Sequence, residues 1–367
     1  MDQVVIRNNF CFFTSKPNLM LVLQREIMIR YIFSVLLLII TCVKGEPLNK
    51  VPIIYSPKYN IILFGIQKLH PFDTEKYKKV YKCLRHNVGI KKDQFYTPEK
   101  VSDEDLKLVH TDRYLKSLNN SKVIAQIAEV PILKFIPNIL LRKRLLIPMK
   151  YGTGGTILGT ELALKYGWAI NLSGGYHHAK SNSGGGFSFY ADIPIAIYKL
   201  WQKDPTLKVM IIDLDAHQGN GYESVLKNDD RIVIVDVYNC QIYPRDYEAK
   251  QYITYDFPIV SYTKDDEYLS IIDSIRKIIS IEKPNLIIYN AGTDIDENDP
   301  LGRLKISEEG TIKRDEIVFE SAKENNVPIL MLLSGGYSKQ SAIIISKSIE
   351  NILTKIEEPN HSLEPAP

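Results

Sequence analysis

Six runs of apolar, mostly β-branched residues recur along the chain and are separated by longer stretches with helical patterning. The runs cover residues 51–55, 169–172, 209–214, 232–237, 286–289 and 329–333, and the clearest helical stretches cover residues 155–166 and 268–281. Short apolar strands that alternate with helices are typical of a parallel β-sheet that is buried on both faces. We therefore predict an α/β fold, a single domain with a central parallel β-sheet flanked by helices. Residues 117–150 contain three prolines and are expected to form a helical insertion over one flank.

The two ends of the chain differ in composition from its centre. Residues 31–43 form an apolar run behind two arginines, so residues 28–45 resemble a secretory signal peptide and residues 1–27 would be upstream or disordered sequence. The apolar run is too short for a stable membrane span. Residues 356–367 are rich in proline and acids and are expected to be a disordered tail, which leaves residues 50–355 for the folded domain. The chain has 367 residues, 45% of them apolar, and a net charge of +3, which suits a substantial core and gives no argument for direct nucleic-acid binding.

The apolar run 209–214 ends in the sequence Asp213-Leu214-Asp215-Ala216-His217. In extended backbone, residues two apart point to the same face, so Asp215 and His217 can reach one cation. The best candidate for a third ligand is Asp294, where the run 286–289 breaks into glycine and acids. One imidazole and two carboxylates leave a zinc ion with an open position, which is typical of a catalytic rather than a structural site.

Two adjacent histidines, His177 and His178, follow the apolar run 169–172 in a glycine-rich turn. A metal-dependent hydrolase still needs a base that takes a proton from water and an acid that protonates the leaving group, and imidazoles suit both roles. Each ring needs a partner that fixes its tautomer. Asp213 and Asn220 lie near the metal motif in sequence, so we pair Asp213 with His177 and Asn220 with His178.

The run 329–333 ends in Ser334-Gly335-Gly336-Tyr337. Two flexible glycines would allow Tyr337 to direct its hydroxyl at a carbonyl bound to the metal. We expect this hydroxyl to stabilise the oxyanion that forms when water attacks the carbonyl.

Taken together, these motifs resemble the histone deacetylase family, and within it most closely the class IV type, across residues 52–350. The matching segments are residues 55–61, 70–73, 109–111, 153–156, 167–171, 184–187, 213–221, 236–239 and 289–294. The resemblance implies the arginase/deacetylase fold, with residues 50–355 as the catalytic domain. It also implies a nuclear or cytoplasmic location, which conflicts with the signal-like segment.

The activity that this resemblance implies is zinc-dependent hydrolysis of acyl-lysine amides in histones or other proteins, with long-chain fatty-acyl groups as candidate substrates. By the same resemblance, Gly185, Gly186 and Phe187 would line the acyl channel. A monovalent cation, K⁺, would lie near the zinc at positions that match Asp213, Asp215, His217, Asp236 and Val237.

Two alternative functions stay open at the level of sequence. One is a binding protein that recognises acyl-lysine without turnover. The other is a small-molecule amidohydrolase or ureohydrolase of the same fold with two metal ions, but Gly219 stands where a second bridging acid is expected, which favours one metal. We accordingly interpret Asp296 and Asp299 as surface loop acids, which with Asp294 and Glu297 would form an acidic rim for basic histone tails.

Overall fold

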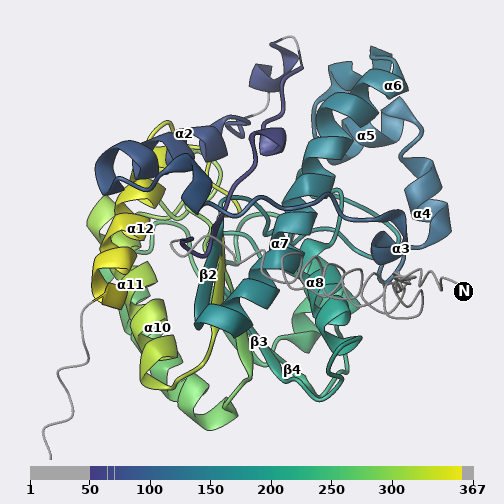
Figure 1. Cartoon of the computed structure of the whole chain (residues 1–367). Helices are drawn as coiled ribbons and strands as arrows, with labels where there is room; N and C mark the ends of the chain where they lie inside the picture. The colour runs from purple at the N-terminus through teal and green to yellow at the C-terminus, as the bar shows by residue number, and fades with distance from the viewer. Residues whose placement is uncertain (1–49, 64, 70, 358–367) are drawn as a thin grey trace, which may run out of the picture. The chain divides into compact units, whose positions relative to one another are not determined.

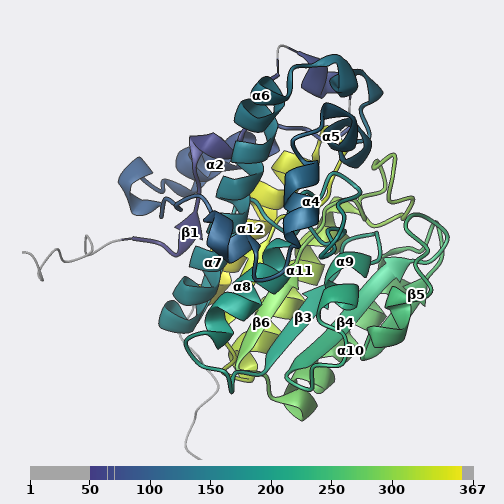
Figure 2. The ribbon, with the colours of Figure 1, turned by 90° about the vertical axis from the view of Figure 1, so that its right-hand side faces the viewer.

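The computed structural model describes residues 50–63, 65–69 and 71–357. Its seven strands form one parallel sheet in the order β1-β2-β7-β6-β3-β4-β5 (Figures 1 and 2). Their bounds are β1 Ile53–Ile54, β2 Trp168–Asn171, β3 Val209–Asp213, β4 Ile232–Asn239, β5 Tyr255–Ile259, β6 Leu286–Asn290 and β7 Ile329–Leu332. The predicted α/β class and parallel sheet are confirmed, and each of the six apolar runs overlaps a strand.

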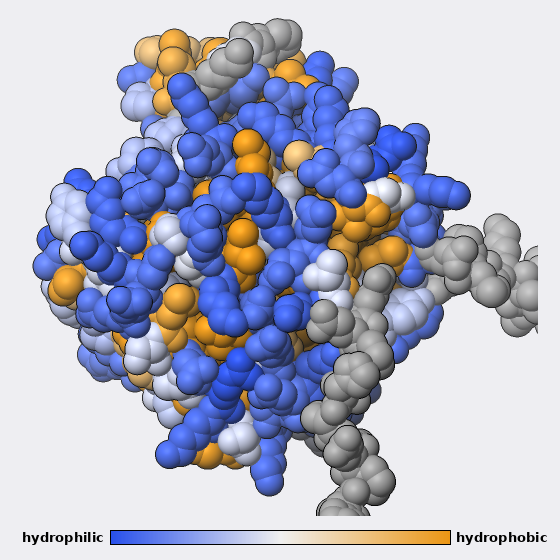
Figure 3. Space-filling model, turned by 90° about the vertical axis from the view of Figure 1, so that its left-hand side faces the viewer, coloured by the Kyte–Doolittle hydropathy of each residue, from blue (hydrophilic) through white to orange (hydrophobic). Residues whose placement is uncertain are grey.

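Helices cover both faces of this sheet. Their bounds are α2 Lys76–Cys83, α3 Asp103–Leu106, α4 Asp112–Ser117, α5 Ser121–Ile127, α6 Asn138–Leu141, α7 Ile147–Tyr166, α8 Asp192–Trp201, α9 Asn220–Val225, α10 Asp265–Glu282, α11 Glu308–Glu324 and α12 Ser341–Glu357. Helices α7 and α8 pack together on one side of the sheet, and α10, α11, α12 and α2 form a second layer on the other side (Figure 1). The outer face of this second layer is largely hydrophilic (Figure 3), as expected for helices whose apolar sides face the interior of the molecule.

The central strands are apolar because no face of them meets water. Every residue of β3 and of β6 is buried, which explains why their sequences show continuous apolar runs rather than alternation. Strand β5 was not predicted, since its burial alternates and it contains Asp256 and Pro258. Proline is tolerated there because β5 is an edge strand of the sheet.

The expected helical insertion is present, but its boundary with the following helix was wrong. Helix α7 is bounded at Ile147 rather than at residue 155, and helical backbone runs without a break from α6 through the π-helical turn Arg142–Leu146 into α7. The insertion has its own apolar cluster, which joins α4, α5 and the π-helical turn Arg142–Leu146 to Phe189 and Tyr190.

The signal-like segment 28–45, the upstream residues 1–27, His70 and all but the first two residues of the tail 356–367 lie outside the described residues. The described residues from Val51 to residue 357 belong to one compact unit. Among the helices of the described part of the chain, none is both long and apolar enough to span a bilayer.

Candidate metal centre and catalytic site

The residues singled out from the sequence follow the carboxyl ends of β2, β3, β6 and β7. Parallel strands end at the same edge of a sheet, which is where open α/β sheets place their ligand sites. Strand β3 lies between β4 and β6, and Asp213 is in register with Asp236 on β4 and with Asn290 on β6. The chain that leaves β3 therefore runs beside the chain that leaves β6.

Asp215, His217 and Asp294 form a buried cluster whose potential ligand atoms all lie within 4.8 Å of one another. His217 Nδ1 lies 3.1 Å from Asp215 Oδ1 and 2.9 Å from Asp294 Oδ2. Burial and the neighbouring Asp215 carboxylate raise the pKa of Asp294 to about 7. Two carboxylates held together away from water are stabilised by a cation between them, so this donor set fits a metal ion such as zinc.

Two glycines allow the loops to approach this cluster closely. A Cβ atom on Gly292 would lie 2.1 Å from Asp215 Oδ2, and a Cβ atom on Gly335 would lie 2.5 Å from Asp294 Oδ2. No larger residue fits at either position without moving a potential ligand. Glycine therefore follows these strands because a side chain at either position would collide with a carboxylate of the cluster.

The two adjacent histidines lie beside this cluster with different partners. His177 Nδ1 lies 2.9 Å from Asp213 Oδ2, and His178 Nδ1 lies 2.9 Å from Asn220 Oδ1, which are the two pairs expected from the sequence. The ring centroids of the two histidines are 4.1 Å apart. Asn290, to which sequence reasoning gave no role, donates a hydrogen bond of 3.0 Å to Asp213 Oδ1 and thereby fixes that carboxylate.

The environment separates the pKa values of the two rings. Burial alone would lower the pKa of His177, but the carboxylates of Asp213 and Asp215 outweigh burial and raise it to about 9. Burial and the nearby His177 charge lower the pKa of His178 well below its ordinary value. The surroundings therefore favour a proton on His177 and a neutral ring on His178.

Tyr337 lines the same cavity as His177, His178 and Asp215. Its ring centroid lies 6.3 Å from that of His217. Burial and the nearby carboxylates of Asp294 and Asp215 raise the pKa of Tyr337 well above its ordinary value, so the phenol stays protonated and can donate.

The interpretation of Asp296 and Asp299 as surface loop acids was wrong, because both side chains are buried. Asp299 accepts hydrogen bonds from the backbone amides of Tyr337 and Ser338 at 2.6 and 3.2 Å. Only Glu297 of the expected acidic rim is exposed, so the rim does not exist as proposed. The acids fold inward because the loop after β6 lies against the segment after β7.

Lys76, which no pattern in the sequence indicated, is fully buried at the start of α2. Its ammonium group donates two hydrogen bonds of 2.7 Å, one to the carbonyl oxygen of Ser334 and one to that of Gly335. Burial lowers the pKa of Lys76 to about 8, although nearby carboxylates oppose this shift. Lys76 binds the carbonyl groups of Ser334 and Gly335, and Asp299 binds the amides of Tyr337 and Ser338. Both side chains therefore fix the position of residues 334–338, the segment that carries Tyr337.

A narrow cavity of about 40 Å³ leads past aromatic side chains to the metal cluster. Phe187 and Phe72 line it with their ring centroids 5.3 Å apart. Gly186 also lines it, and a Cβ atom there would lie 2.4 Å from His178 Cδ2, so only glycine fits. Gly185 does not line this cavity, because it lies instead beside the hydroxyl of Tyr243.

Asp213, Asp236 and Val237, the positions expected to hold a monovalent cation, are buried in neighbouring strands. The carboxyl group of Asp236 lies next to that of Glu223, which sequence reasoning missed, and apart from this contact Asp236 Oδ1 and Glu223 Oε1 have no hydrogen-bond partner among the described residues. Burial and the Asp213 charge raise the pKa of Asp236 well above its ordinary value, and burial raises that of Glu223 to about 7. A proton shared between these two acids, or a cation such as K⁺ beside them, would satisfy the buried oxygens.

Comparison with known proteins agrees with this geometry. The histone deacetylase domain matches residues 70–354. The chain is 47% identical to histone deacetylase 2 of Arabidopsis thaliana over 307 residues, which cover 83% of this chain and 79% of that protein. It is 27% identical to histone deacetylase 1 of Homo sapiens over 286 residues, which cover 73% of this chain and 58% of the human protein. The crystal structure of the HDA15 HD domain has the same fold, with a TM-score of 0.67 at 16% identity over 84% of this chain and 88% of that one.

The match to the domain covers well over half of the chain, and the plant relative is well above 30% identical over most of its own length. The chain therefore belongs to the histone deacetylase family, and with it to the hydrolases that act on carbon–nitrogen bonds of linear amides.

Proposed function

We propose that the chain is a zinc-dependent hydrolase of acyl-lysine side chains in histones or other proteins, of the class IV type. The observation that carries this proposal is the buried cluster of Asp215, His217 and Asp294 beside two histidines with opposite pKa shifts. Zinc held by these three residues would act as a Lewis acid that polarises the amide carbonyl and lowers the pKa of water. Side chains of the protein would carry out the proton transfers and stabilise the oxyanion.

His178 is the neutral ring and is therefore suited to accept a proton from the attacking water. The carboxylate of Asp213, which faces Nδ1 of His177 and is not a proposed zinc ligand, favours the imidazolium, so His177 suits the transfer of a proton to the departing lysine amine. Two titratable groups whose pKa values are pushed apart are the usual basis for assigning a base and an acid. Asn220 orients His178 without adding a charge that would raise the pKa of that ring.

Tyr337 is proposed to donate its phenolic proton to the oxyanion that forms at the substrate carbonyl. Its raised pKa supports this role because the hydroxyl remains a donor throughout the neutral range. Asp299 and Lys76 would position this hydroxyl through the backbone of the segment that carries it.

The cavity volume bears on the acyl group. A space of about 40 Å³ is small beside the usual range of ligand cavities, about 300–1,000 Å³, so it favours a short acyl group over a long fatty chain. We propose Gly185, Gly186 and Phe187 as the acyl-channel segment, of which Gly186 and Phe187 line the cavity itself. We also propose that Asp213, Asp236 and Val237 hold K⁺, which would neutralise the buried acids next to His177.

The function is tested by measuring hydrolysis of matched acetyl-lysine and myristoyl-lysine peptides by the purified protein. Activity on at least one peptide should disappear after chelation and return when zinc is restored, and a His178→Ala variant should stay inactive after zinc is restored. Stoichiometric zinc with no hydrolysis of either peptide would support the alternative, a protein that binds acyl-lysine without turnover.

A further inference from the structure

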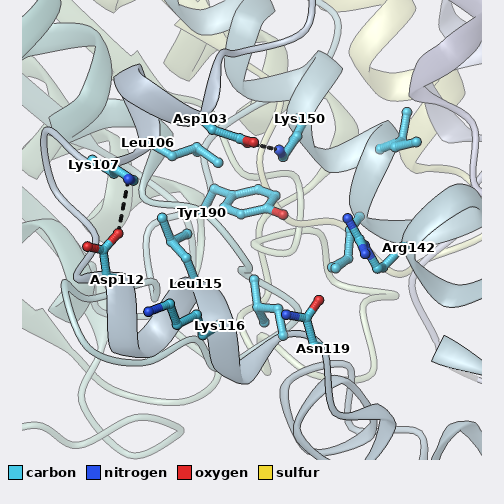
Figure 4. A pocket seen from close by; sticks show the side chains of 13 residues that line it. Asp103, Leu106, Lys107, Asp112, Leu115, Lys116, Asn119, Arg142, Lys150 and Tyr190 are labelled. Carbon is cyan, nitrogen blue, oxygen red and sulfur yellow. Dashed lines mark hydrogen bonds and ion pairs between the residues drawn. The ribbon is translucent and has the colours of Figure 1, made fainter. Parts of the chain in front are cut away.

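A second cavity, of about 330 Å³, lies between α3, α4 and the start of α7 (Figure 4). It shares no lining residue with the catalytic cavity. On the first turn of α7, Met149 lines the catalytic cavity, whereas Ile147 and Lys150 line this one. Its volume lies at the lower end of the range of small-molecule sites, which is about 300–1,000 Å³.

Cationic side chains surround this cavity, and two of them have acidic partners. Lys150 pairs with Asp103, and Lys107 lies 3.2 Å from Asp112 (Figure 4). The carboxylates of Asp103 and Asp112 are 73% and 64% exposed, so both acids lie at the solvent-facing edge.

Two further cations, Lys116 and Arg142, line the same cavity, and no ion pair forms with either of them among the described residues. The cavity lining therefore carries an excess of two positive charges. Exposed pairs such as Lys107 with Asp112 contribute little, about 0–1 kcal/mol, so a multivalent anion can compete for Lys107 as well.

The interior of the cavity offers one hydroxyl and an apolar wall. Tyr190 is only 2% exposed, and its hydroxyl points to the side of the cavity where Arg142 lies (Figure 4). Burial raises the pKa of Tyr190, so the phenol remains a hydrogen-bond donor at neutral pH. Leu106, Leu115 and Leu146 form part of the remaining wall and leave an apolar surface for the body of a ligand.

We propose that this cavity binds a phosphate monoester with a small apolar or aromatic body. A phosphate monoester carries a charge of about −1.5 to −2 at neutral pH, which balances the two cations that lack acidic partners. The guanidinium of Arg142 offers paired donors that suit phosphate oxygens, and Lys116 adds positive charge from the other side of the cavity (Figure 4). Tyr190 donates to the same phosphate, while the leucines pack against the organic part.

Phenyl phosphate is a suitable probe, and its binding to the full-length, zinc-loaded protein can be measured by isothermal titration calorimetry. We expect saturable binding to one site that weakens at least tenfold in Arg142→Gln and by a smaller factor in Lys116→Gln. Arg144→Gln is the matched control, because Arg144 lies in the same π-helical turn and does not line the cavity. Tyr190→Phe keeps the ring and should weaken binding several-fold.

Three results would overturn the proposal. They are the absence of saturable binding, equal affinity of Arg142→Gln and Arg144→Gln, and equal affinity of the wild-type protein for phenyl sulfate, which carries one charge. The third result would show that the cavity does not select a dianion. Because Arg142, Lys116 and Arg144 are all exposed, these substitutions should leave the fold intact, which circular dichroism can verify.

Discussion

The carboxylate of Asp299 accepts a hydrogen bond of 2.6 Å from the backbone amide of Tyr337. The other oxygen of the same carboxylate accepts from the amides of Leu301 and Gly302, at 2.9 and 3.1 Å. One acid therefore ties the loop after β6 to the segment after β7. An acid that is not part of the metal cluster thus determines where the tyrosine lies.

Replacing Asp299 by alanine should lower kcat about 10- to 100-fold, because a small displacement of a reacting group has effects of this size. KM should change little, since Asp299 does not line the cavity that would hold the substrate. Zinc content should stay the same. Glu297→Ala is the control, because that side chain is exposed in the same loop, and equal kcat values for the two variants would refute the positioning role.

The metal cluster and the histidine pairs could be predicted because their residues follow the ends of strands, and these strands are recognisable in the sequence. Asp215 and His217 end one apolar run and Asp294 ends another, and a parallel sheet brings such ends together. Asp213 and Asn220 were assigned from their closeness in sequence to the metal motif. Their hydrogen bonds to His177 and His178 follow from the same sheet geometry.

The positioning residues could not be predicted, because their burial depends on contacts that are distant in sequence. Asp299 stands in a stretch of acids that is indistinguishable from a solvated loop. Lys76 belongs to a helix with Lys78, Lys79 and Lys82, which has the composition of a solvent-facing helix, yet its partner Ser334 lies 258 residues further along the chain. Strand β5 was missed for a local reason, since an edge strand tolerates polar residues and proline.

Tyr337→Phe should lower kcat about 10²- to 10³-fold, which is the range for removal of one oxyanion donor. The ring would remain, so its packing near Phe72 and His217 should be kept. Zinc content and the affinity for a substrate peptide should therefore match those of the wild-type protein. The role assigned to the hydroxyl would be wrong if the variant hydrolysed its best peptide at the wild-type rate.

Lys76→Met should lower the free energy of unfolding by about 1–3 kcal/mol, because two buried carbonyl groups would lose their donor. It should also lower kcat, since those carbonyls belong to Ser334 and Gly335 in the segment that carries Tyr337. Lys79→Met is the matched control on the same helix, because Lys79 is exposed and pairs with Asp73 at the surface. Urea denaturation and steady-state kinetics measure both effects, and similar results for the two variants would contradict the prediction.

His110 should make stability depend on pH below neutrality. Its Nε2 accepts a hydrogen bond of 2.9 Å from the amide of Ala191, and burial lowers its pKa from 6.5 to about 4. Between these values the unfolded chain binds a proton that the folded chain excludes, so the free energy of unfolding should fall as the pH drops from 6.5 towards 4. The largest possible contribution is about 3 kcal/mol.

Urea denaturation of the wild-type protein and of His110→Gln at about pH 7 and about pH 5 isolates this contribution, because the other titrating groups are common to both proteins. The loss of stability on acidification should be smaller in His110→Gln, whose side chain can still accept from Ala191. His86→Gln replaces an exposed histidine and should behave like the wild type. Parallel pH dependences for all three proteins would show that His110 is not the cause.

The most direct test of the metal centre is the zinc content of purified wild-type protein and of Asp294→Ala, measured by mass spectrometry of the metal. Asp294 joins Asp215 and His217 from a separate strand, so its loss leaves one carboxylate and one imidazole for the ion. We predict about one zinc per wild-type chain and a loss of most of it in the variant. Full retention of zinc by Asp294→Ala would contradict the proposed site.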